Sequence, residues 1–220
     1  MRLYCSPGAC SQAPHIAFRE IGIDIELVAV DLASKLTRAG RDFTTLNPTG
    51  CVPLLEMDDG STLRETSVIL RFAAELMPSA RLARVTDPVA ALRLGEWLSF
   101  LASDVHQGLR HLAAAQTASG AAAMRQRLLK DFAWIDVQLA TAPYLAAQGY
   151  SVADIYLWVI ANWTRAPWID SVRDIDLDLS RFDNICRWHK RVAQRPAVRA
   201  ALEAERLLRL PFVRPDPVRR

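Results

Sequence analysis

A change of sequence pattern at Asp87 and Pro88 constrains the fold of this chain more than any other feature. Before this point, short runs of branched apolar residues alternate with stretches of helical periodicity. Beyond it, apolar residues recur at helical spacing and no run has the character of a strand. An aspartate followed by a proline is typical of a helix start, because the carboxylate caps the first turn and proline tolerates that position. The pattern therefore predicts an α/β part followed by an all-helical part.

The part before residue 79 is expected to form a small sheet with covering helices. Strands are predicted where branched apolar residues are bounded by turn residues, and helices where apolar residues recur every three or four positions. The recognisable elements are a strand at Leu3–Cys5, a helix at Ala13–Ile21, a strand at Ile25–Val30, a hairpin at Val52–Leu63 and a helix at Glu65–Leu76. On the last helix, we expect one face to carry Val68, Ile69, Phe72 and Leu76.

Pro53 opens the first strand of that hairpin, where a proline is unusual because it cannot donate to a strand ladder. An edge strand is the ordinary explanation. A cis peptide bond between Val52 and Pro53 in a tight bend is the other. The residues alone do not separate the two.

The part beyond Pro88 is expected to be a bundle of helices. Their predicted positions are Val89–Leu112, Met124–Leu139, Val152–Trp163, Phe182–Val192 and Val198–Leu207. Ser151 can cap the third of these helices while Asp154 reaches back to it, which makes a capping box with a structural role. We therefore expect one domain at residues 1–78, a linker at 79–87 and an all-helical domain at 88–220.

Composition and charge argue against several classes of protein. The 220 residues are 51% hydrophobic, which is enough for a substantial core. Lysine and arginine total 27 against 24 acidic residues, and the net charge of +3 is too small and too evenly spread to indicate nucleic-acid binding. We find no run of about 18 apolar residues and no recognisable signal peptide, so we expect a cytoplasmic protein that does not enter the membrane.

The cysteines are expected to be free thiols, because neither metal-site nor disulfide-framework spacing relates Cys5, Cys10, Cys51 and Cys186. Pro14 is tolerated only in the first turn of a helix, so Cys10 or Ser11 should cap that helix. The free N–H groups and the dipole at a helix start are expected to lower the pKa of the Cys10 thiol below about 7.5. The alternative is that Cys10 is simply a small buried residue.

Glu65 and Thr66 open another predicted helix. Free N–H groups at a helix start favour an anion, and the neighbouring carboxylate would suit an ammonium group. A ligand with both charges, such as the γ-glutamyl end of a peptide, fits that pair. An ordinary helix cap is the alternative explanation. For His106, a surface histidine with satisfied hydrogen bonds is likewise the alternative to a functional one.

Taken together, these features resemble the glutathione transferase superfamily, from Met1 to about Leu207. The general elements are the strand-turn-helix opening, the loop that closes on Val52-Pro53, Glu65-Thr66 at a helix start and Ser151-Val152-Ala153-Asp154-Ile155-Tyr156-Leu157 in the helical part. Similarity to the bacterial beta class in particular is carried by Leu3-Tyr4, Ser6-Pro7-Gly8-Ala9-Cys10-Ser11, Ala13-Pro14-His15 and Arg195-Pro196-Ala197-Val198. The resemblance implies an α/β, thioredoxin-like first domain with the element order βαβαββα, followed by an all-helical domain.

The resemblance also implies roles for individual residues. Cys10 would lie beside the glutathione sulfur, Ser11 would be a second donor, and His106 would approach the sulfur from the helical domain. The backbone of Val52 would pair with the cysteinyl part of glutathione, and Pro53 would be a cis-proline. The other binding residues would be Lys35 for the glycine carboxylate, Glu65 and Thr66 for the γ-glutamyl group, and Ser103 and Asp104 for the ligand of a partner subunit.

The implied activity is conjugation of the glutathione thiolate to a small hydrophobic electrophile by a homodimer, with glutathione as co-substrate and no metal. Thiol–disulfide exchange through Cys10 is a further activity. One alternative is a glutathione-dependent reductase or dehalogenase in which Cys10 forms a mixed disulfide. Another is a non-catalytic relative that binds protein partners, although such a scaffold would not need Lys35, Glu65 and Thr66.

The sequence departs from the beta class at two positions. Cys5 stands where a second tyrosine is usual, and Gln107 stands where a lysine is common. The first change removes an aromatic group near the sulfur, and the second removes a positive charge that would favour a thiolate. A thiol at Cys5 could also lie near enough to resolve a disulfide on Cys10. Trp163 is expected to line the place of the electrophile.

Overall fold

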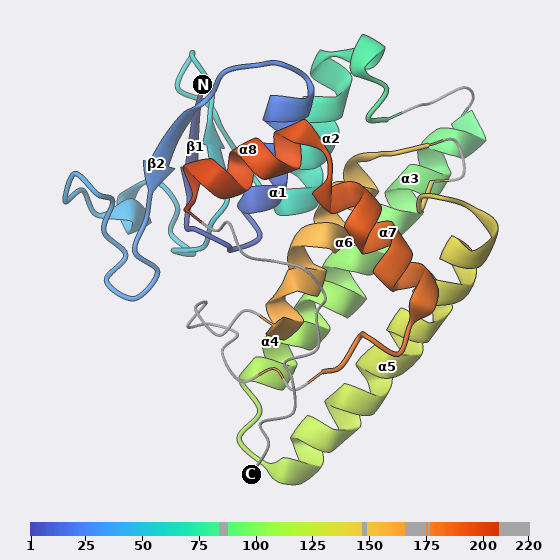
Figure 1. The fold of residues 1–220 in the computed structure, drawn as a ribbon. Coiled ribbons are helices and arrows are strands. Elements are labelled where there is room, and N and C mark those ends of the chain that lie inside the picture. The colour runs from blue at the N-terminus through green and yellow to red at the C-terminus, as the bar shows by residue number, and fades with distance from the viewer. Residues whose placement is uncertain (84–87, 147–148, 166–174, 176, 207–220) are drawn as a thin grey trace.

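The computed structural model describes residues 1–83, 88–146, 149–165, 175 and 177–206, and Figure 1 shows how they are arranged. The expected linker is described only at residues 79–83, so Asp87 lies outside the described residues. The predicted helix end at Leu207 lies outside them as well. Within them, every strand lies before residue 65 and only helices follow residue 88, as the change of pattern predicted. None of the described helices is both long enough and apolar enough to cross a membrane.

The sheet has four strands in the order β2-β1-β3-β4. They are β1 (Arg2–Cys5), β2 (Glu26–Ala29), β3 (Leu54–Glu56) and β4 (Thr62–Arg64). β1 runs parallel to β2 and antiparallel to β3, and β3 forms the predicted hairpin with β4. Three of the strands therefore lie within a few residues of the predicted positions, and the fourth closes the hairpin.

The register of the sheet gives it two buried faces. Tyr4 pairs with Leu54 and Leu3 pairs with Leu55, and successive side chains of a strand point to opposite faces. Leu55 joins the main core with the helices, whereas Tyr4 and Leu54 join a smaller core on the other face. In that smaller core, the ring of Phe43 stacks on Tyr4 with 5.5 Å between centroids.

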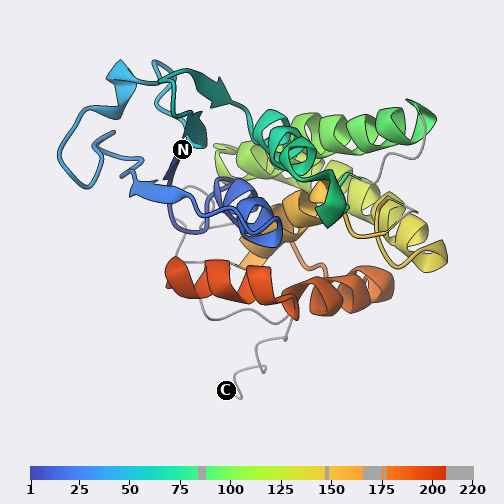
Figure 2. The same cartoon turned by 90° about the horizontal axis from the view of Figure 1, so that it is seen from above.

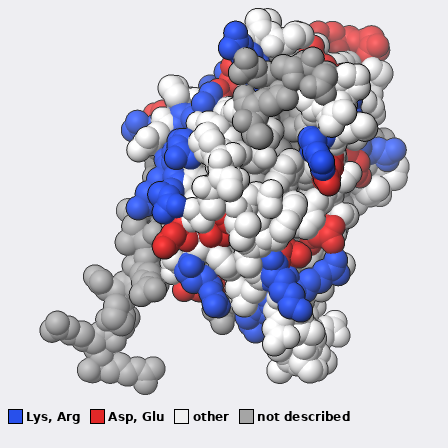
Figure 3. Space-filling model, turned by 90° about the vertical axis from the view of Figure 1, so that its right-hand side faces the viewer, with Lys and Arg blue, Asp and Glu red and all other residues white. Residues whose placement is uncertain are grey.

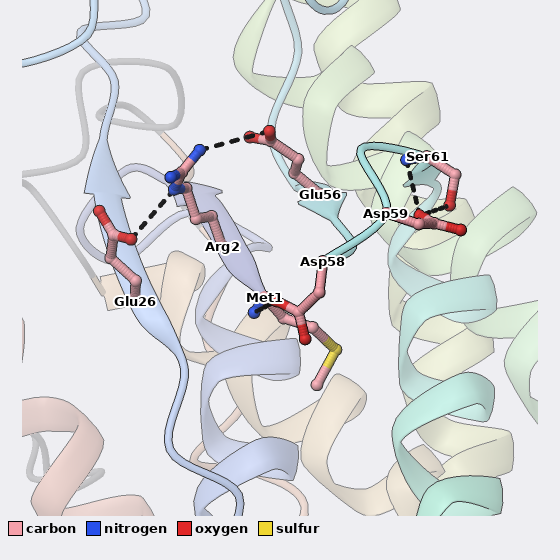
Figure 4. Close-up of polar contacts among 7 residues, drawn as sticks. All are labelled: Met1, Arg2, Glu26, Glu56, Asp58, Asp59 and Ser61. Atoms are coloured by element: carbon pink, nitrogen blue, oxygen red, sulfur yellow. Dashed lines mark hydrogen bonds and ion pairs between the residues drawn. The ribbon is translucent and has the colours of Figure 1, made fainter.

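Exposed ion pairs connect neighbouring strands (Figure 4). Arg2 on β1 pairs with Glu26 on β2 and with Glu56 on β3, and the N-terminal ammonium group pairs with Asp58 in the hairpin turn. Exposed pairs of this kind contribute about 0–1 kcal/mol each. The buried faces, rather than these pairs, hold the sheet together.

The expected second helix of this part is absent between residues 30 and 53, all of which are described. A single 3-10 turn, η1 (Phe43–Thr45), takes its place. The carboxylate of Asp42 caps that turn by accepting from the N–H of Thr44 at 2.8 Å. Phe43 anchors the turn to the smaller core, so one buried ring replaces the packed face of a full helix.

Two helices, α1 (Gln12–Glu20) and α2 (Thr66–Leu76), cover one face of the sheet. Figure 2 shows α1 between α2 and the last helix, and contacts on both sides agree with that view. The buried residues of α2 include Ile69, Leu70, Ala73 and Ala74. The face predicted for α2 is therefore partly wrong, since Val68 is 47% exposed and Leu76 is 39% exposed.

The helical part contains α3 (Pro88–Phe100), α4 (Gln107–Ala113), α5 (Ala118–Thr141), α6 (Val152–Asn162), α7 (Asp183–Ala193) and α8 (Pro196–Ala204). A π-helical segment, η3 (Leu101–His106), joins α3 to α4, and 3-10 turns occur at η2 (Pro78–Ala80) and η4 (Trp163–Arg165). Every residue of α6 is buried, which places this helix at the centre. α5 begins earlier than predicted, because the Thr117 hydroxyl caps it by accepting from the N–H of Gly120 at 3.1 Å. On the face shown in Figure 3, basic and acidic side chains are interspersed.

Asp154 ties α6 to its surroundings. The predicted capping box with Ser151 is present, and Oδ2 accepts from both the N–H and the hydroxyl of Ser151, at 2.9 and 3.0 Å. Oδ1 accepts from the N–H of Leu145 at 3.0 Å and from the indole N–H of Trp188 at 2.9 Å. One buried carboxylate thus joins α6, the segment before it and α7.

Candidate active site

The turn that leads into α1 carries Cys10. Cys10 is 8% exposed, and its Sγ donates a hydrogen bond to the carbonyl of Val52 at 3.3 Å. The peptide between Val52 and Pro53 is cis, as the resemblance implied. The strand-leading loop therefore lies directly against the thiol, and a thiol that donates to a carbonyl is favoured in its neutral form.

Ser11 caps α1, but its hydroxyl is turned back into the same turn. It accepts from the N–H of Ser6 at 3.1 Å and donates to the carbonyl of Ser6 at 3.2 Å. The residue is fully buried. These contacts favour a structural role for Ser11 over the catalytic one that the resemblance implied.

Glu65 and Thr66 stand together at the start of α2. Thr66 is buried, whereas Glu65 is exposed and has a φ of 68°. A non-glycine residue in such a conformation is strained by about 1–3 kcal/mol, and strain of this kind clusters at ligand sites. Lys35 also has a positive φ, of 61°, and its Nζ donates to the carbonyl of Gly50 at 3.1 Å. Lys35 is thereby held beside the loop that leads to Val52.

His106 approaches from the helical part, at the end of η3. Its Nδ1 lies 2.7 Å from the hydroxyl of Tyr156. Its ring packs edge-on against Trp163 at 4.9 Å between centroids, and the Trp163 indole donates to the carbonyl of Gly8 at 2.9 Å. Burial, with a smaller effect from the charge of Arg110, lowers the pKa of His106 to about 4. The imidazole is therefore neutral at pH 7.

Tyr156 joins the two sides of the site from the centre of α6, where it is 1% exposed. Burial raises the pKa of its hydroxyl, with a further increase from nearby Cys10 and a decrease from a hydrogen bond with Thr66. The sequence pattern gave no signal for it, since a tyrosine in an apolar helix looks like any core residue. We call Cys10, Val52, Thr66, His106 and Tyr156 the thiol cluster.

The Cys10 thiol is not acidified by its helix start. Burial raises its pKa to about 11, and the Thr66 side chain and the charge of Arg110 offset this only in part. The prediction of a pKa below 7.5 is therefore wrong for this structure, because lost hydration outweighs the helix N–H groups. Arg110 lies one turn beyond His106 on α4 and is exposed. Arg110 thereby supplies a positive charge to the site, which Gln107, standing where a lysine is common, does not.

The buried carboxylate of Glu205, the residue directly after α8, holds the turn that carries Cys10 in place. Glu205 Oε2 accepts from the N–H of Gly8 and from Nε2 of Gln12, both at 2.9 Å. Its Oε1 lies 2.8 Å from Nδ1 of His15, and Arg19 donates to the other ring nitrogen at 2.8 Å. The sequence gives no signal for this role of Glu205, because a glutamate near the end of a helix usually faces solvent.

Ser103 and Asp104 are not brought to the thiol cluster. The Ser103 hydroxyl donates to the carbonyl of Ser99 at 2.9 Å, and Asp104 pairs with Arg127 at 2.6 Å. Both positions lie on η3, but their contacts are with α3 and α5. Their expected role toward a partner subunit stays a prediction.

The remaining cysteines near this end of the sheet differ sharply from each other. Cys5 is 4% exposed, and burial, with a further effect from Glu205, raises its pKa to about 12. A thiol so held is poorly suited to resolve a disulfide on Cys10. Cys51 is exposed, adjacent to Val52, and donates to the carbonyl of Thr49 at 3.4 Å.

A cavity elsewhere in the helical part lacks the chemistry of the thiol cluster. A cavity of about 420 Å³ lies between α3, α5 and the start of α6, with Trp97, Trp134 and Tyr150 in its lining and no residue of the thiol cluster. Within the described residues, no group of three or more His, Cys, Asp or Glu side chains is arranged to hold a metal ion. The thiol cluster, in contrast, brings a neutral thiol, a threonine hydroxyl and a neutral imidazole close together, and neutral donors suit a sulfur anion.

Comparison with known proteins agrees with this geometry. Residues 8–76 match the family model of the glutathione S-transferase N-terminal domain, and residues 96–196 match that of the C-terminal domain. Glutathione S-transferase GstA of Escherichia coli O157:H7 is 33% identical over 208 residues, which cover 94% of this chain and 100% of that protein.

Solved structures give the same result. A sphingomonad glutathione S-transferase in complex with glutathione is 41% identical, with a TM-score of 0.86 over 94% of this chain and 100% of that one. A bacterial beta class glutathione S-transferase from Sphingomonas chungbukensis is 38% identical, with a TM-score of 0.86 and the same coverage. The chain belongs to the glutathione S-transferase family, a family of transferase enzymes.

Proposed function

We propose that this protein conjugates the thiolate of glutathione to a small hydrophobic electrophile at the thiol cluster. The observation that carries the proposal is that groups from both parts of the chain lie together at Cys10, next to the strained helix start at Glu65. Cys10 contacts Val52 in the first part and acts on Tyr156 of the second, and Tyr156 contacts His106. The relative whose structure contains glutathione supports the choice of co-substrate.

In this proposal, glutathione displaces one contact of the free site. The N–H of its cysteinyl residue would bind the Val52 carbonyl, which now accepts from Cys10. The freed Cys10 S–H would then donate to the glutathione thiolate. The γ-glutamyl group would lie against Glu65 and Thr66 and the glycine carboxylate against Lys35, since a carboxylate suits an ammonium group and an ammonium suits a carboxylate.

The state of Cys10 favours conjugation over disulfide exchange. A thiol with a pKa of about 11 is almost entirely protonated at pH 7, and the thiolate rather than the thiol is the nucleophile. Cys10 is therefore a donor to the sulfur of glutathione in this proposal, and glutathione itself supplies the nucleophile. Exchange through a mixed disulfide on Cys10 is the second candidate activity.

The electrophile would lie beside Trp163, whose ring packs against His106, and near Arg110, which is exposed and whose charge acts on Cys10. We propose that the enzyme works as a cytoplasmic homodimer, with Ser103 and Asp104 near the partner subunit. The electrophile itself is proposed only as a class, a small apolar molecule with an electron-poor carbon.

The test is a pair of measurements on the full chain. Retention on glutathione resin and a dissociation constant by calorimetry test the binding of glutathione, which a non-catalytic scaffold without this site would not show. Conjugation rates with a panel of activated aryl halides and unsaturated carbonyls, set against reduction of a glutathione mixed disulfide, test the reaction. The proposal predicts that Cys10→Ala retains at least part of the conjugation and loses the disulfide reduction. Conjugation that disappears in Cys10→Ala, with glutathione binding intact, would contradict it.

A further inference from the structure

Tyr156 and His106 make a buried contact. The hydroxyl oxygen and Nδ1 are 2.7 Å apart, and the two rings meet edge-on at 86°. The tyrosine is 1% exposed and the histidine 8% exposed, so water does not compete for this bond. The helical pattern of the sequence predicts neither this contact nor a role for Tyr156, because Tyr156 occupies one of many apolar positions in that pattern.

The direction of this hydrogen bond follows from the protonation of its partners. Burial raises the pKa of the Tyr156 hydroxyl and lowers that of His106 to about 4, so at pH 7 both groups are neutral. Of these two neutral groups, the phenol O–H is the more acidic donor and the unprotonated imidazole nitrogen is the more basic acceptor. At a separation of 2.7 Å, the tyrosine O–H therefore donates to His106 Nδ1. A neutral imidazole that accepts at Nδ1 carries its own proton on Nε2.

The chemical consequence is a choice between two roles for His106. A base with a pKa of about 4 accepts a proton from a thiol of pKa about 8.5 only with a loss of four to five orders of magnitude in the equilibrium. General base catalysis by His106 is therefore disfavoured. A neutral N–H donor, in contrast, stabilises a sulfur anion without any proton transfer.

We propose that Tyr156 is a positioning residue that fixes His106 in the tautomer with its proton on Nε2, and thereby makes the imidazole a donor to the sulfur of bound glutathione. In this arrangement the Tyr156 hydroxyl donates to Nδ1, and Nε2 is left as the donor of the imidazole. The proposal rests on the proposed function for the identity of the sulfur, whereas the tautomer itself is a property of the free protein.

The groups that face this pair are known from the structure. Cys10 and Glu65 act on Tyr156, and Arg110 acts on His106. Since Arg110 disfavours the protonated imidazole, it supports the neutral state that the proposal requires. Burial and the charge of Arg110 thus both lower the pKa of His106.

The first measurement is the nitrogen spectrum of the protein with 15N-labelled histidine, with the His106 signals assigned by their loss in His106→Gln. In the wild type we expect Nε2 to carry the proton and Nδ1 to be unprotonated. In Tyr156→Phe, which keeps the ring and removes the hydroxyl, we expect a mixture of both tautomers. Tyr4→Phe is the matched control, because it removes another buried phenol that donates at 2.8 Å, to Glu56. A proton on Nδ1 in the wild type would overturn the proposal.

The second measurement is the pH dependence of the thiolate absorption of bound glutathione. Tyr156→Phe should raise the pKa of the bound thiol by about one unit and lower kcat/KM at pH 7 about tenfold, with the dissociation constant of glutathione within about twofold. In a His106→Gln background, whose amide donates without a tautomer, the same substitution should have no further effect. An unchanged thiol pKa in Tyr156→Phe, or an equal rise in the His106→Gln background, would refute the positioning role. Failure of the wild type to bind glutathione would refute the proposed function instead, and the tautomer would still be decided by the nitrogen spectrum.

Discussion

Two helices of this protein begin beside an acidic residue, and their starts differ in almost every physical respect. At α6, Asp154 is fully buried and accepts from four donors. At α2, Glu65 is exposed, has a φ of 68° and makes no capping hydrogen bond through its side chain. Burial raises the pKa of Asp154 to about 6 even though its donors act in the opposite direction.

The difference separates a start built for stability from one kept open for a ligand. A buried carboxylate persists only where hydrogen bonds replace its lost hydration. An exposed and strained one persists only because the surrounding structure enforces it, and such residues concentrate at functional sites. The same chemical group therefore serves the fold at α6 and, by our proposal, the ligand at α2.

The largest expected effect comes from Asp154→Ala. It would leave the N–H of Leu145, both donors of Ser151 and the indole of Trp188 without their acceptor, so we expect a loss of about 3–5 kcal/mol of unfolding free energy. That is more than the 1–2 kcal/mol of an ordinary cap, which the sequence alone suggested. Urea titration measures it, with glutathione affinity expected within about twofold. Asp183→Ala at the exposed start of α7 is the matched control and should cost less than about 1 kcal/mol. A loss below 1 kcal/mol in Asp154→Ala would remove the contrast.

The cysteines extend the contrast between buried and exposed groups. With a pKa of about 11, Cys10 is about one part in a thousand thiolate at pH 8, and its alkylation rate should rise about tenfold for each pH unit up to that pKa. Cys51 is exposed and should be alkylated first, and Cys5 should be protected throughout. Peptide mapping after timed iodoacetamide treatment measures the order, with the urea-unfolded chain as control. Rapid alkylation of Cys10 at pH 7 would show that burial does not govern this thiol.

A smaller effect on binding is expected from Glu65→Gln. The loss of a charged partner for the ammonium group of glutathione should weaken binding by about 1.5–3 kcal/mol, or roughly 10- to 150-fold. Stability should hardly change, because the side chain is exposed. Calorimetric titration measures the affinity. Glu75→Gln on the same helix, which breaks only an exposed pair with Arg71, is the control. Equal affinities for both variants and the wild type would take Glu65 out of the site.

The smallest effect, and the most diagnostic, is expected from Glu65→Gly. Glycine adopts a positive φ without strain, so relief of about 1–3 kcal/mol should exceed the added flexibility of the unfolded chain. We expect a net gain of up to about 1 kcal/mol in stability together with the same loss of glutathione affinity as in Glu65→Gln. Thermal melting measures the gain. A destabilised glycine variant would mean that the conformation of Glu65 stores no strain.

Local pattern was sufficient for most of the fold. Strand and helix positions followed from periodicity. The cis peptide at Pro53 followed only from the resemblance, because the residues alone also fitted an edge-strand proline. The α2 face was misjudged because α2 packs against α6 as well as the sheet, so its buried arc depends on a partner that is distant in sequence. The replacement of a helix by η1 is likewise set by the packing of Phe43, which no local propensity encodes.

The site was less predictable than the fold. Cys10, Val52 and Thr66 lie together and Tyr156 connects them to His106, while the roles of these residues toward glutathione stay predictions. The acidity of Cys10 was misjudged because helix position is visible in sequence and burial is not. Tyr156 and Glu205 gave no signal, since one resembles a core residue and the other a surface residue. What was missed is the set of contacts between residues far apart in the chain.

Glu205 shows what such contacts imply for the order of assembly. The carboxylate that holds Gly8 lies 197 positions further along the chain, so we expect the loop that bears Cys10 to settle only after the chain has been made as far as Glu205 and α8 has docked on α1. The early sheet can form first, because its pairings are close in sequence. The site around Cys10 is therefore expected to form last, and a partly synthesised or locally opened chain would have the thioredoxin-like sheet without a complete site.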